Sequence, residues 1–519
     1  MATDSEKISS LQPSGDKILY CQDLPSKPSA AVGKVLVTGA SGYIGGRLVP
    51  ELLARGYKVR VMVRGPSPSY QELWPEVEVV TADARNFDQL RSALEGIDTA
   101  YYLIHSLLLG QKEFAAADIQ AAINFRKAAE DNQIKRIIYL GGLGDTQTQL
   151  STHLQSRIHV AEELKKGAVP VTTLRAATII GSGSASYEII QNLVRKLPII
   201  FVPCWARTKC QPIAIRDVIK YLVGVLEVPA TSGKSFDIGG INILSYSEML
   251  KMWADCFNKK RFFTRFFSFL PLYSYLGALI TPVPAPITRS LMEGLKNEVV
   301  CQNRTIQEHL PFKPLSYREA IILAMNREDQ DKIYTRWSDA YPPAHELALK
   351  LHEIQGRPQY SKTYSLVTKK EASSLFHRIC RVGGKEGWFS SNWLWRARGA
   401  IDKVLLGVGT SRGRRSQTTL KINDVIDFWR VEDLQKDKRL LLRAEMKLPG
   451  KAWLEFQIED EGSQRRLLLK PYFYTQNIWG SLYWYFFSPF HQFIFNDLIK
   501  QIEKRSAPSL VSMGAARKG

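Results

Sequence analysis

Short apolar runs alternate with helical stretches through the first half of the chain. The runs have the length and the β-branched composition of buried strands. One stretch between them places Phe114, Ala122, Phe125 and Ala129 at the spacing of a single helix face. This order predicts an α/β fold, a doubly wound parallel sheet with crossover helices. The expected strands are 35–38, 59–63, 77–81, 99–104, 137–140 and 171–174.

The pattern changes twice further along the chain. From about 182 to 325 it becomes more helical and aromatic, which predicts a helical subdomain attached to the sheet. A charged, proline-containing stretch then indicates a linker to a separate domain. The expected parts are a disordered leader at 1–32, a first domain at 33–325, a linker at 326–360, a second domain at 361–505 and a flexible tail at 506–519.

The second domain shows alternation of period two, which is typical of half-buried strands. Apolar residues alternate with charged ones from 442 to 448 and again from 452 to 458, and Pro449 and Gly450 between them predict a hairpin turn. Ser488 followed by Pro489 predicts the start of a final helix. Its expected apolar stripe is Phe490, Phe493, Ile494 and Leu498. The pattern predicts an α+β domain.

Composition narrows the class of protein. The 519 residues are 45% hydrophobic, which excludes a chain that is disordered throughout, and the formal net charge is +20. A basic chain favours anionic partners such as a phosphate-bearing cofactor or acidic lipid headgroups. We expect no nucleic-acid partner, because the basic residues are spread along the chain without a binding motif. The six cysteines are too dispersed for a disulfide framework, and neither a signal peptide nor a spanning helix is expected.

A glycine motif directly follows the first expected strand. In Thr38-Gly39-Ala-Ser41-Gly42-Tyr43-Ile44-Gly45, the first glycine permits a tight turn, the second lets the backbone approach a pyrophosphate, and the third lets a helix pack closely. The helix N-terminus then faces the anion. The position between a β-branched strand and a helix predicts a Rossmann-type NAD(P)-binding domain.

The residue after the second expected strand bears on cofactor choice. An NAD-binding site usually has Asp or Glu there to bind the ribose hydroxyls, whereas this chain has Arg64. A guanidinium could bind a 2′-phosphate, which favours NADP(H) over NAD(H). Arg47 could add a second positive charge. The alternative is that Arg64 points into solvent.

The motif resembles that of extended and atypical short-chain dehydrogenase/reductases, including the NmrA-like branch. The resemblance covers about 33–325. Thr81-Ala-Asp83-Ala84 resembles the segment that contacts adenine, and the run that begins at Leu103 resembles the strand end beside the nicotinamide ribose. The resemblance therefore implies cofactor contacts from Gly39, Ser41, Gly42, Tyr43, Ile44, Gly45, Arg64, Asp83, Ala84 and Leu103.

The chain departs from this family at the proton relay. Such reductases carry Tyr and, four residues later, Lys, with Ser upstream; here His153 and Arg157 stand at the paired positions, and Gly141 and Gly142 stand near the Ser. Arg stays protonated and cannot shuttle a proton. His153 could act as an acid, or it could be structural. Arg157 could bind phosphate or ribose. No histidine spacing indicates a metal site.

The segment around Trp388, Arg412 and Asp427 is similar to an uncharacterised domain fused to NmrA-like proteins, which resembles the START-like helix-grip class. The resemblance covers about 360–505 and implies an apolar or lipid-like ligand. Arg412, Arg414 and Arg415 could meet an acidic headgroup or form a solvated turn. The aromatic clusters 262–269 and 483–487 could touch a membrane interface, with burial as the favoured alternative.

Two hypotheses of function follow. The first is an oxidoreductase that uses NADP(H) for hydride transfer to an apolar carbonyl or quinone-like substrate. The second is a non-catalytic protein, a dinucleotide sensor or a lipid-handling or assembly factor that binds NADP(H) as a ligand. We expect a cytoplasmic protein, with peripheral contact to the inner face of the membrane left open. The oligomeric state and the substrate stay undetermined at this stage.

Overall fold

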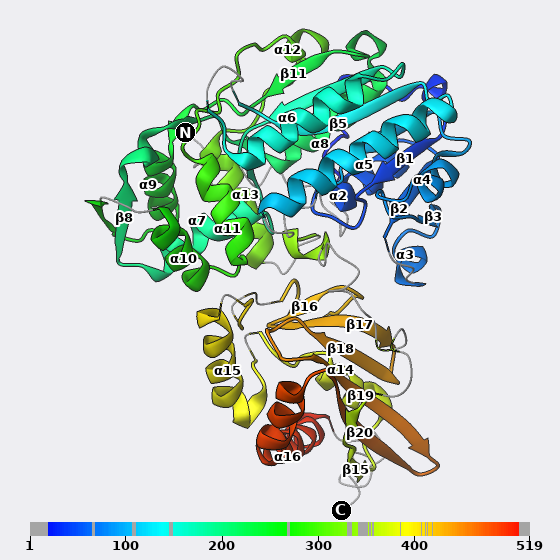
Figure 1. The fold of residues 1–519 in the computed structure, drawn as a ribbon, viewed down its shortest axis with the longest axis vertical. Helices are drawn as coiled ribbons and strands as arrows, with labels where there is room; N and C mark the ends of the chain where they lie inside the picture. The colour runs from blue at the N-terminus through cyan, green and yellow to red at the C-terminus, as the bar shows by residue number, and fades with distance from the viewer. Residues whose placement is uncertain are drawn as a thin grey trace, which may run out of the picture. The chain divides into compact units, whose positions relative to one another are not determined.

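The chain forms two compact units in a computed structural model (Figure 1). The first unit comprises Met1–Ile280 and Ala285–Pro343, and the second comprises Thr281–Pro284 and Ala344–Gly519. The structure describes residues 19–64, 68–105, 111–144, 149–266, 270–329, 335–340, 351, 354, 358–384, 386–405, 407–410, 412, 414–417 and 419–507.

A parallel sheet of seven strands organises the first unit. The strand order is β11-β6-β5-β4-β1-β2-β3. The strands are β1 Val35–Thr38, β2 Val59–Val63, β3 Glu78–Thr81, β4 Thr99–Tyr102, β5 Arg136–Gly142, β6 Val171–Ala176 and β11 Ser235–Ile238. The predicted Rossmann-type sheet is confirmed, and all six expected strands are present, while β11 was not predicted.

Helices cover both faces of this sheet. Val35 and Val37 of β1 lie in a core formed with α2 and α8, whereas Leu36 lies in the opposite core with α4, α5 and α6. Figure 1 shows α5 and α6 side by side on one face. The helices are α2 Gly45–Ala54, α3 Pro68–Leu73, α4 Phe87–Leu94, α5 Gln111–Asp131, α6 Thr152–Lys165 and α8 Ile215–Glu227. The predicted crossover helix is therefore α5.

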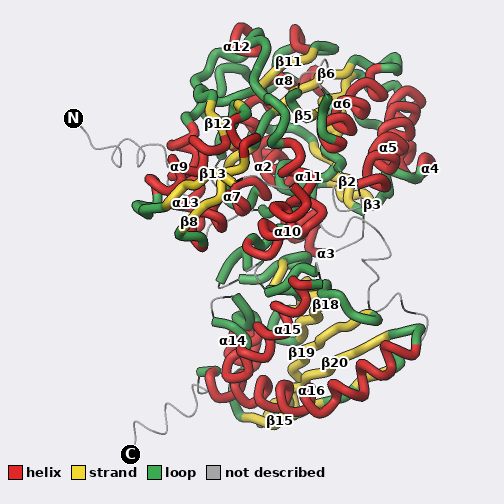
Figure 2. The backbone as a smooth tube through the Cα atoms, turned by 60° about the vertical axis from the view of Figure 1, so that its left-hand side comes forward, coloured by secondary structure: helices red, strands yellow, loops and turns green. Residues whose placement is uncertain are grey.

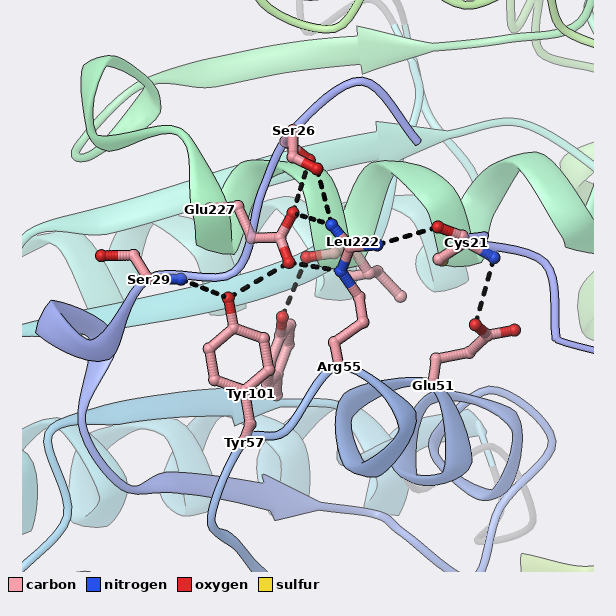
Figure 3. Close-up of polar contacts among 9 residues, drawn as sticks. All are labelled: Cys21, Ser26, Ser29, Glu51, Arg55, Tyr57, Tyr101, Leu222 and Glu227. Atoms are coloured by element: carbon pink, nitrogen blue, oxygen red, sulfur yellow. Dashed lines mark hydrogen bonds and ion pairs between the residues drawn. The ribbon is translucent and has the colours of Figure 1, made fainter. Parts of the chain in front are cut away.

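The chain before β1 is anchored to the sheet's helices. The Glu227 carboxylate of α8 accepts hydrogen bonds from Arg55 and Ser26, and Arg55 also donates to the carbonyl of Ser26 (Figure 3). A short 3-10 helix, Ala30–Val32, follows. The predicted disordered leader therefore does not include residues 19–32, and residues 1–18 lie outside the described part of the chain.

A helical subdomain extends the first unit beyond the sheet. Its core contains Tyr187 and Trp253, whose rings meet edge to face at 4.8 Å. Its elements are β7 Ile179–Ile180, α7 Ala185–Lys196, β8 Ile199–Pro203, β9 Lys209–Cys210, β10 Ile213–Ala214, β12 Leu244–Ser245, α9 Tyr246–Cys256, β13 Phe262–Phe266, α10 Leu270–Ile280, α11 Ala285–Gly294, α12 Ile306–His309 and α13 Tyr317–Asp329. The boundary expected at residue 325 thus falls inside α13.

In its described residues, the second unit is an antiparallel sheet with three α-helices. The strand order is β14-β20-β19-β18-β17-β16, and β15 also pairs with β20. The strands are β14 Tyr360–Ser361, β15 Tyr364–Thr368, β16 Val425–Ile426, β17 Trp429–Gln435, β18 Arg439–Ala444, β19 Lys451–Glu461 and β20 Gln464–Tyr474; the helices are α14 Ala372–Ile379, α15 Asn392–Val404 and α16 Ile478–Arg505. This arrangement is compatible with the predicted α+β domain.

Two details of the second unit differ from the prediction. The hairpin exists, but β18 ends at Ala444, and the Glu445 carboxylate beyond it is buried between Arg412 and Arg430 at 2.6 and 2.5 Å. Arg415 is likewise buried and paired with Asp424 at 2.7 Å. These arginines are therefore part of the core, neither a solvated turn nor an exposed headgroup site.

The final helix is longer than predicted. α16 begins at Ile478, with Asn477 as its N-cap, and Pro489 lies inside it. Figure 2 shows it as one continuous helix. The predicted stripe is only partly buried, since Leu498 is in the core while Phe490 and Phe493 are exposed. The hydrophobic core of the second unit contains several tryptophans, and the residues that α16 contributes to it are Phe495, Leu498, Ile499 and Ile502.

Candidate dinucleotide and substrate site

The glycine turn has no room for side chains at two of its three glycines. Gly39 adopts φ +64°, and a Cβ there would lie 2.7 Å from the carbonyl oxygen of Leu103. A Cβ on Gly45 would overlap the carbonyl oxygen of Gly39. The amide of Gly42 donates to the carbonyl of Gly39 at 2.9 Å, which closes the turn. α2 begins at Gly45, and the amide of Gly46 donates to the carbonyl of Gly42 at 3.0 Å, so the turn runs directly into the helix.

The ends of β1 and β4 are locked together beside this turn. The Thr38 hydroxyl donates to the carbonyl of Tyr101 at 2.9 Å and accepts from the amide of Leu103 at 3.0 Å. Ser41, Tyr43 and Ile44 lie on the turn itself and are partly buried. The turn, the start of α2 and the end of β4 therefore form one rigid edge of the parallel sheet.

Arg47 has a structural role. Its side chain is buried and donates hydrogen bonds to the carbonyls of Ser182 and Thr335 at 2.9 and 3.1 Å. The Thr335 hydroxyl in turn donates to the carbonyl of Tyr43 at 2.9 Å. The second phosphate-binding charge expected at Arg47 is therefore wrong, because the guanidinium is committed to holding the glycine turn in place.

Two arginines gather at the ends of β2 and β3. Arg64 directly follows β2 and is close enough to Asp83 and Arg85 to interact with both. Arg85 pairs with the Asp83 carboxylate at 3.0 Å, and its side chain is about half exposed. Burial raises the pKa of Asp83, but the hydrogen bonds from Arg85 outweigh it and hold that pKa below its ordinary value. Asn124 fixes the segment by donating to the carbonyl of Ala84 at 3.2 Å.

His153 and Arg157 lie one turn apart on α6 and point to different parts of the site. The Arg157 guanidinium donates to the carbonyls of Ile104 and Leu140, beyond β4 and within β5, and stacks over the Tyr139 ring at 4.8 Å. The His153 imidazole lines the adjoining cavity. Of this expected pair, His153 therefore faces the cavity and Arg157 is held against the ends of β4 and β5.

A second histidine stands behind His153. His105 and His153 have ring centroids 5.1 Å apart, and the Nδ1 atom of His105 lies 2.8 Å from an Asp118 carboxylate oxygen. Burial lowers the pKa of His153 well below 6.5, and the charges of His105 and Arg157 lower it further. Burial also lowers the pKa of His105, against the opposing effect of Asp118. His153 is therefore a neutral imidazole at physiological pH.

The glycines at the end of β5 leave little room for a serine. A Cβ on Gly142 would lie 3.1 Å from the Leu154 side chain, and one on Gly141 would lie 3.0 Å from the Tyr139 ring. Both distances are tighter than ordinary van der Waals contact. Neither glycine could take a side chain without a small shift of Leu154 or Tyr139, so no serine hydroxyl stands at the end of β5.

A cavity of about 370 Å³ opens beside the glycine turn. Tyr43 and Ile44 of the turn, Gly142 of β5 and His153 of α6 lie along its wall. The rest of its lining is mostly aliphatic and comes from the helical subdomain, including Ile189, Ile190, Leu193, Leu250, Ile287, Leu291 and Met292. A molecule in this cavity would meet an apolar surface with few polar groups, and His153 is one of them.

The expected site residues thus fall into three neighbouring groups. The glycine turn with Leu103, the pair Asp83 and Ala84 with Arg64, and the pair His153 and Arg157 all lie at the carboxyl edge of the parallel sheet. Sequence reasoning missed Arg85 and the Asp118 partner of His105. The charge of Arg85, two residues after Asp83, was a visible signal, whereas the Asp118 contact depends on the fold.

The geometry of the edge fits a dinucleotide. The close approach at Gly39 and the N-terminus of α2, which carries the positive end of the helix dipole, form a surface against which a pyrophosphate can rest. The ends of β2 and β3 would then hold the adenosine ribose, and the ends of β4 and β5 would hold the nicotinamide beside the cavity. The residues present therefore match the requirements of the cofactor.

Comparison with known families agrees with this geometry. Residues 39–192 match an NAD(P)H-binding family, and residues 354–498 match a family described as a protein of unknown function, DUF2867. The two matches fall in the first and second units respectively.

Curated relatives match less than half of the chain in the alignments below. The chain is 27% identical over 229 residues to the mitochondrial NADH dehydrogenase [ubiquinone] 1 alpha subcomplex subunit 9 of Arabidopsis thaliana, covering 42% of this chain and 56% of that protein. It is 33% identical over 118 residues to the 3-beta-hydroxysteroid dehydrogenase of Mycolicibacterium neoaurum, covering 21% of this chain and 31% of that protein. The chain thus spans about half of the first relative and about a third of the second.

Among solved structures, the chain is similar to a nucleoside-diphosphate-sugar epimerase from Staphylococcus aureus. The identity is 15%, the TM-score is 0.47, and the match covers 56% of this chain and 99% of that one.

Proposed function

Because the chain joins an NAD(P)H-binding Rossmann domain of the short-chain dehydrogenase/reductase type to a DUF2867 domain, we propose that it is an oxidoreductase that uses NADP(H) to reduce an apolar carbonyl or quinone-like substrate. The observation that carries the proposal is the continuity between the glycine turn and the cavity, which share Tyr43 and Ile44. When bound, the reduced dinucleotide supplies a hydride.

Arg64 and Arg85 support the preference for the phosphorylated cofactor. Both guanidinium groups lie at the ends of β2 and β3, where the adenosine ribose of a bound dinucleotide ends. Asp83 neutralises one of the two charges, so a net positive charge remains for a 2′-phosphate. A site that selects the unphosphorylated cofactor would present a carboxylate without this excess of positive charge.

The cavity supports an apolar substrate. The wall consists mainly of leucine, isoleucine and methionine side chains. Burial of an apolar substrate against them is favourable, whereas a charged substrate would find few hydrogen-bond partners there. The His153 side chain is the imidazole in that wall, so a substrate oxygen directed at His153 meets a hydrogen-bond donor. That direction also brings the reacting carbon toward the end of β5, where the nicotinamide of a bound cofactor would lie.

His153 acts in this proposal as a neutral donor. A neutral imidazole can polarise a carbonyl by hydrogen bonding without carrying positive charge. Arg157 stays protonated and contributes positive charge to the edge of the sheet, and it does not move a proton. The proton that completes the reduced product is drawn from water in this scheme, because no phenol and lysine pair stands at α6 to deliver it.

A second candidate function rests on that same missing pair. A protein that binds the dinucleotide without turnover needs the glycine turn and the two arginines but no proton relay. Gly141 and Gly142 favour this alternative, since a serine in either place would first have to move Tyr139 or Leu154. In that case the dinucleotide is a ligand that is sensed, or one that supports a lipid-handling or assembly role.

Binding and turnover measurements distinguish the two. Calorimetry with the purified chain should detect NADPH binding, and absorbance at the nicotinamide band should fall when a quinone or an apolar aldehyde is added. Tight NADPH binding with no turnover across a panel of such substrates would favour the sensor. The Arg64→Asp variant should weaken NADPH more than NADH, and equal losses for both would remove the NADP(H) assignment.

A further inference from the structure

The outer face of α16 is apolar over its first five turns. Trp479, Leu482, Phe486, Phe490 and Phe493 recur at intervals of three and four residues, so they share one side of the helix. All five are exposed: Trp479 by 72%, Phe486 by 69% and Phe493 by 64%. We call these five residues the aromatic stripe. A bare apolar surface of this kind on a folded unit marks a contact site.

The inner face of the same helix packs against the sheet. Trp484 stacks on Phe473 of β20 at 5.8 Å, and Phe495 packs with Tyr364 of β15 at 5.6 Å. The helix is therefore held to the sheet by one side, and the stripe is not needed for the fold of the second unit. Substitutions on the stripe can accordingly test a contact without unfolding the domain.

The charges around the stripe indicate what it contacts. From Ile478 to Asn496 the sequence holds no Asp, Glu, Lys or Arg. Basic side chains lie at the border of this segment. The Lys362 ammonium donates to the side-chain oxygen of Gln492 at 3.2 Å, and Lys500 is exposed two turns beyond Phe493 on the same face of α16. On this border Lys362 and Lys500 outnumber Asp497, whose carboxylate accepts hydrogen bonds from Ser390 and Ser391. An apolar centre with a net positive border complements a surface that is apolar inside and anionic outside.

The start of α15 extends this surface. The Ser391 hydroxyl donates to the Asp497 carboxylate of α16 at 2.8 Å, which places the start of α15 beside the far end of the stripe. Two residues later, Trp393 is 67% exposed. Tryptophan, with an apolar ring and a polar N–H, is the residue type enriched at the boundary between lipid tails and headgroups.

We propose that the aromatic stripe of α16 docks the protein on an anionic membrane surface, with the helix in the plane of the bilayer and its aromatic rings at headgroup depth. Among the described residues, no helix has the length and apolarity to cross a bilayer. A second copy of the chain is disfavoured as the occupant, because each copy brings the same lysine border and a net charge of +20. Acidic lipid headgroups are attracted both by the lysine side chains at the border and by the net positive charge.

Sedimentation with lipid vesicles tests the proposal. The full-length chain should sediment with phosphatidylcholine vesicles that contain phosphatidylglycerol, and at least about tenfold less with phosphatidylcholine alone or at high salt. The Trp479→Ser/Phe486→Ser/Phe493→Ser variant should lose at least about tenfold of the binding. Phe262→Ser, which removes a 75% exposed phenylalanine from the first unit, is the matched control and should bind like the wild type.

A cysteine at the stripe separates lipid docking from other occupants. The Phe486→Cys variant should react rapidly with a water-soluble maleimide in buffer and should be protected when anionic vesicles are added. Slow reaction without vesicles would show that another part of the chain, or a second copy, already covers the stripe, and this would overturn the proposal. Failure of the wild type to sediment with anionic vesicles would overturn it as well, whatever the dinucleotide measurements show.

Discussion

The imidazoles of His105 and His153 face each other with ring centroids 5.1 Å apart, and burial lowers the pKa of both. Both imidazoles are therefore neutral near pH 7. If the chain reduces a substrate in the adjoining cavity, its turnover number should therefore be constant from about pH 6 to 8, since the pKa of His153 lies well below its ordinary value. A step with an apparent pKa near 6.5 would contradict the neutral donor.

Removing that donor should slow turnover without loss of the cofactor. The His153→Phe variant should lower kcat by about a hundredfold, as expected for one hydrogen bond to a developing oxyanion, while NADPH affinity stays unchanged. The control is His159→Phe, since His159 is exposed on the same helix. Steady-state kinetics and calorimetry check both parts, and equal losses in the two variants would point to a defect of α6 rather than of the site.

Arg85 should contribute to cofactor selection although it follows no strand directly. The Arg85→Ala variant should weaken NADPH binding by about tenfold and leave NADH binding nearly unchanged, because only the former gains a charge-assisted hydrogen bond. Arg91→Ala removes an exposed arginine of α4 and serves as the control. Titration with each nucleotide measures the effect, and a matching loss for NADH would place Arg85 outside the 2′-phosphate site.

Gly45 should be intolerant of even a methyl group. In Gly45→Ala the new Cβ overlaps the carbonyl oxygen of Gly39, so the helix must move away from the pyrophosphate and dinucleotide binding should be lost. At Gly56 a Cβ meets nothing within 4 Å, although φ is +82°. Gly56→Ala should therefore cost about 1 kcal/mol of stability but keep the cofactor. Calorimetry and thermal melting distinguish a lost site from a weakened fold.

The buried carboxylate of Glu445 should be essential for the second unit. Glu445→Gln removes the charge that Arg412 and Arg430 share, leaving buried guanidinium groups without compensation. The free energy of unfolding should fall by about 3 to 5 kcal/mol. Asp460→Asn, at an exposed pair with Arg465, should change it by less than about 0.5 kcal/mol. Urea unfolding, monitored by tryptophan fluorescence, compares the two variants.

His491 should make the second unit sensitive to acid. Burial among aromatic rings lowers the pKa of His491 to about 4, from an ordinary value of 6.5. Between pH 6.5 and 4, His491 is protonated in the unfolded chain but not in the folded chain. The free energy of unfolding therefore falls as the pH is lowered from about 6.5 to 4, by about 3 kcal/mol at most. In His491→Phe this part of the pH dependence should vanish. Unfolding curves at several pH values would show it as the difference between wild type and variant.

The parallel sheet was predictable because most of its strands are buried on both faces and therefore read as continuous apolar runs. β11 escaped prediction because Asp237 interrupts its four residues, and only the fold shows that this carboxylate pairs with Arg175 at 2.6 Å. The start of α16 was misplaced for a different reason. Ser488 followed by Pro489 has the form of a helix start, yet the helix had already begun at the Asn477 cap.

The candidate site also contains residues that the sequence could predict and features that only the fold reveals. Residues whose function depends on chain spacing, such as Gly39, Gly45 and the pair His153 and Arg157, could be named from the sequence. The cavity could not, because its wall comes from elements between residues 43 and 299 that only the fold assembles. The burial of Arg412 was also unforeseen, since an isolated basic cluster gives no sign of the carboxylate that will meet it.

The hydrogen bonds from Arg47 to Ser182 and Thr335 set a practical limit on how the protein can be divided. A fragment cut at residue 325 would end inside α13 and would strip the Arg47 guanidinium of a partner that lies about 290 positions later in the chain. Such a fragment would be expected to aggregate or to bind nucleotide poorly even with every glycine intact. Dissection of the first unit should therefore retain the chain through Ala340, where the segment that closes over Arg47 ends.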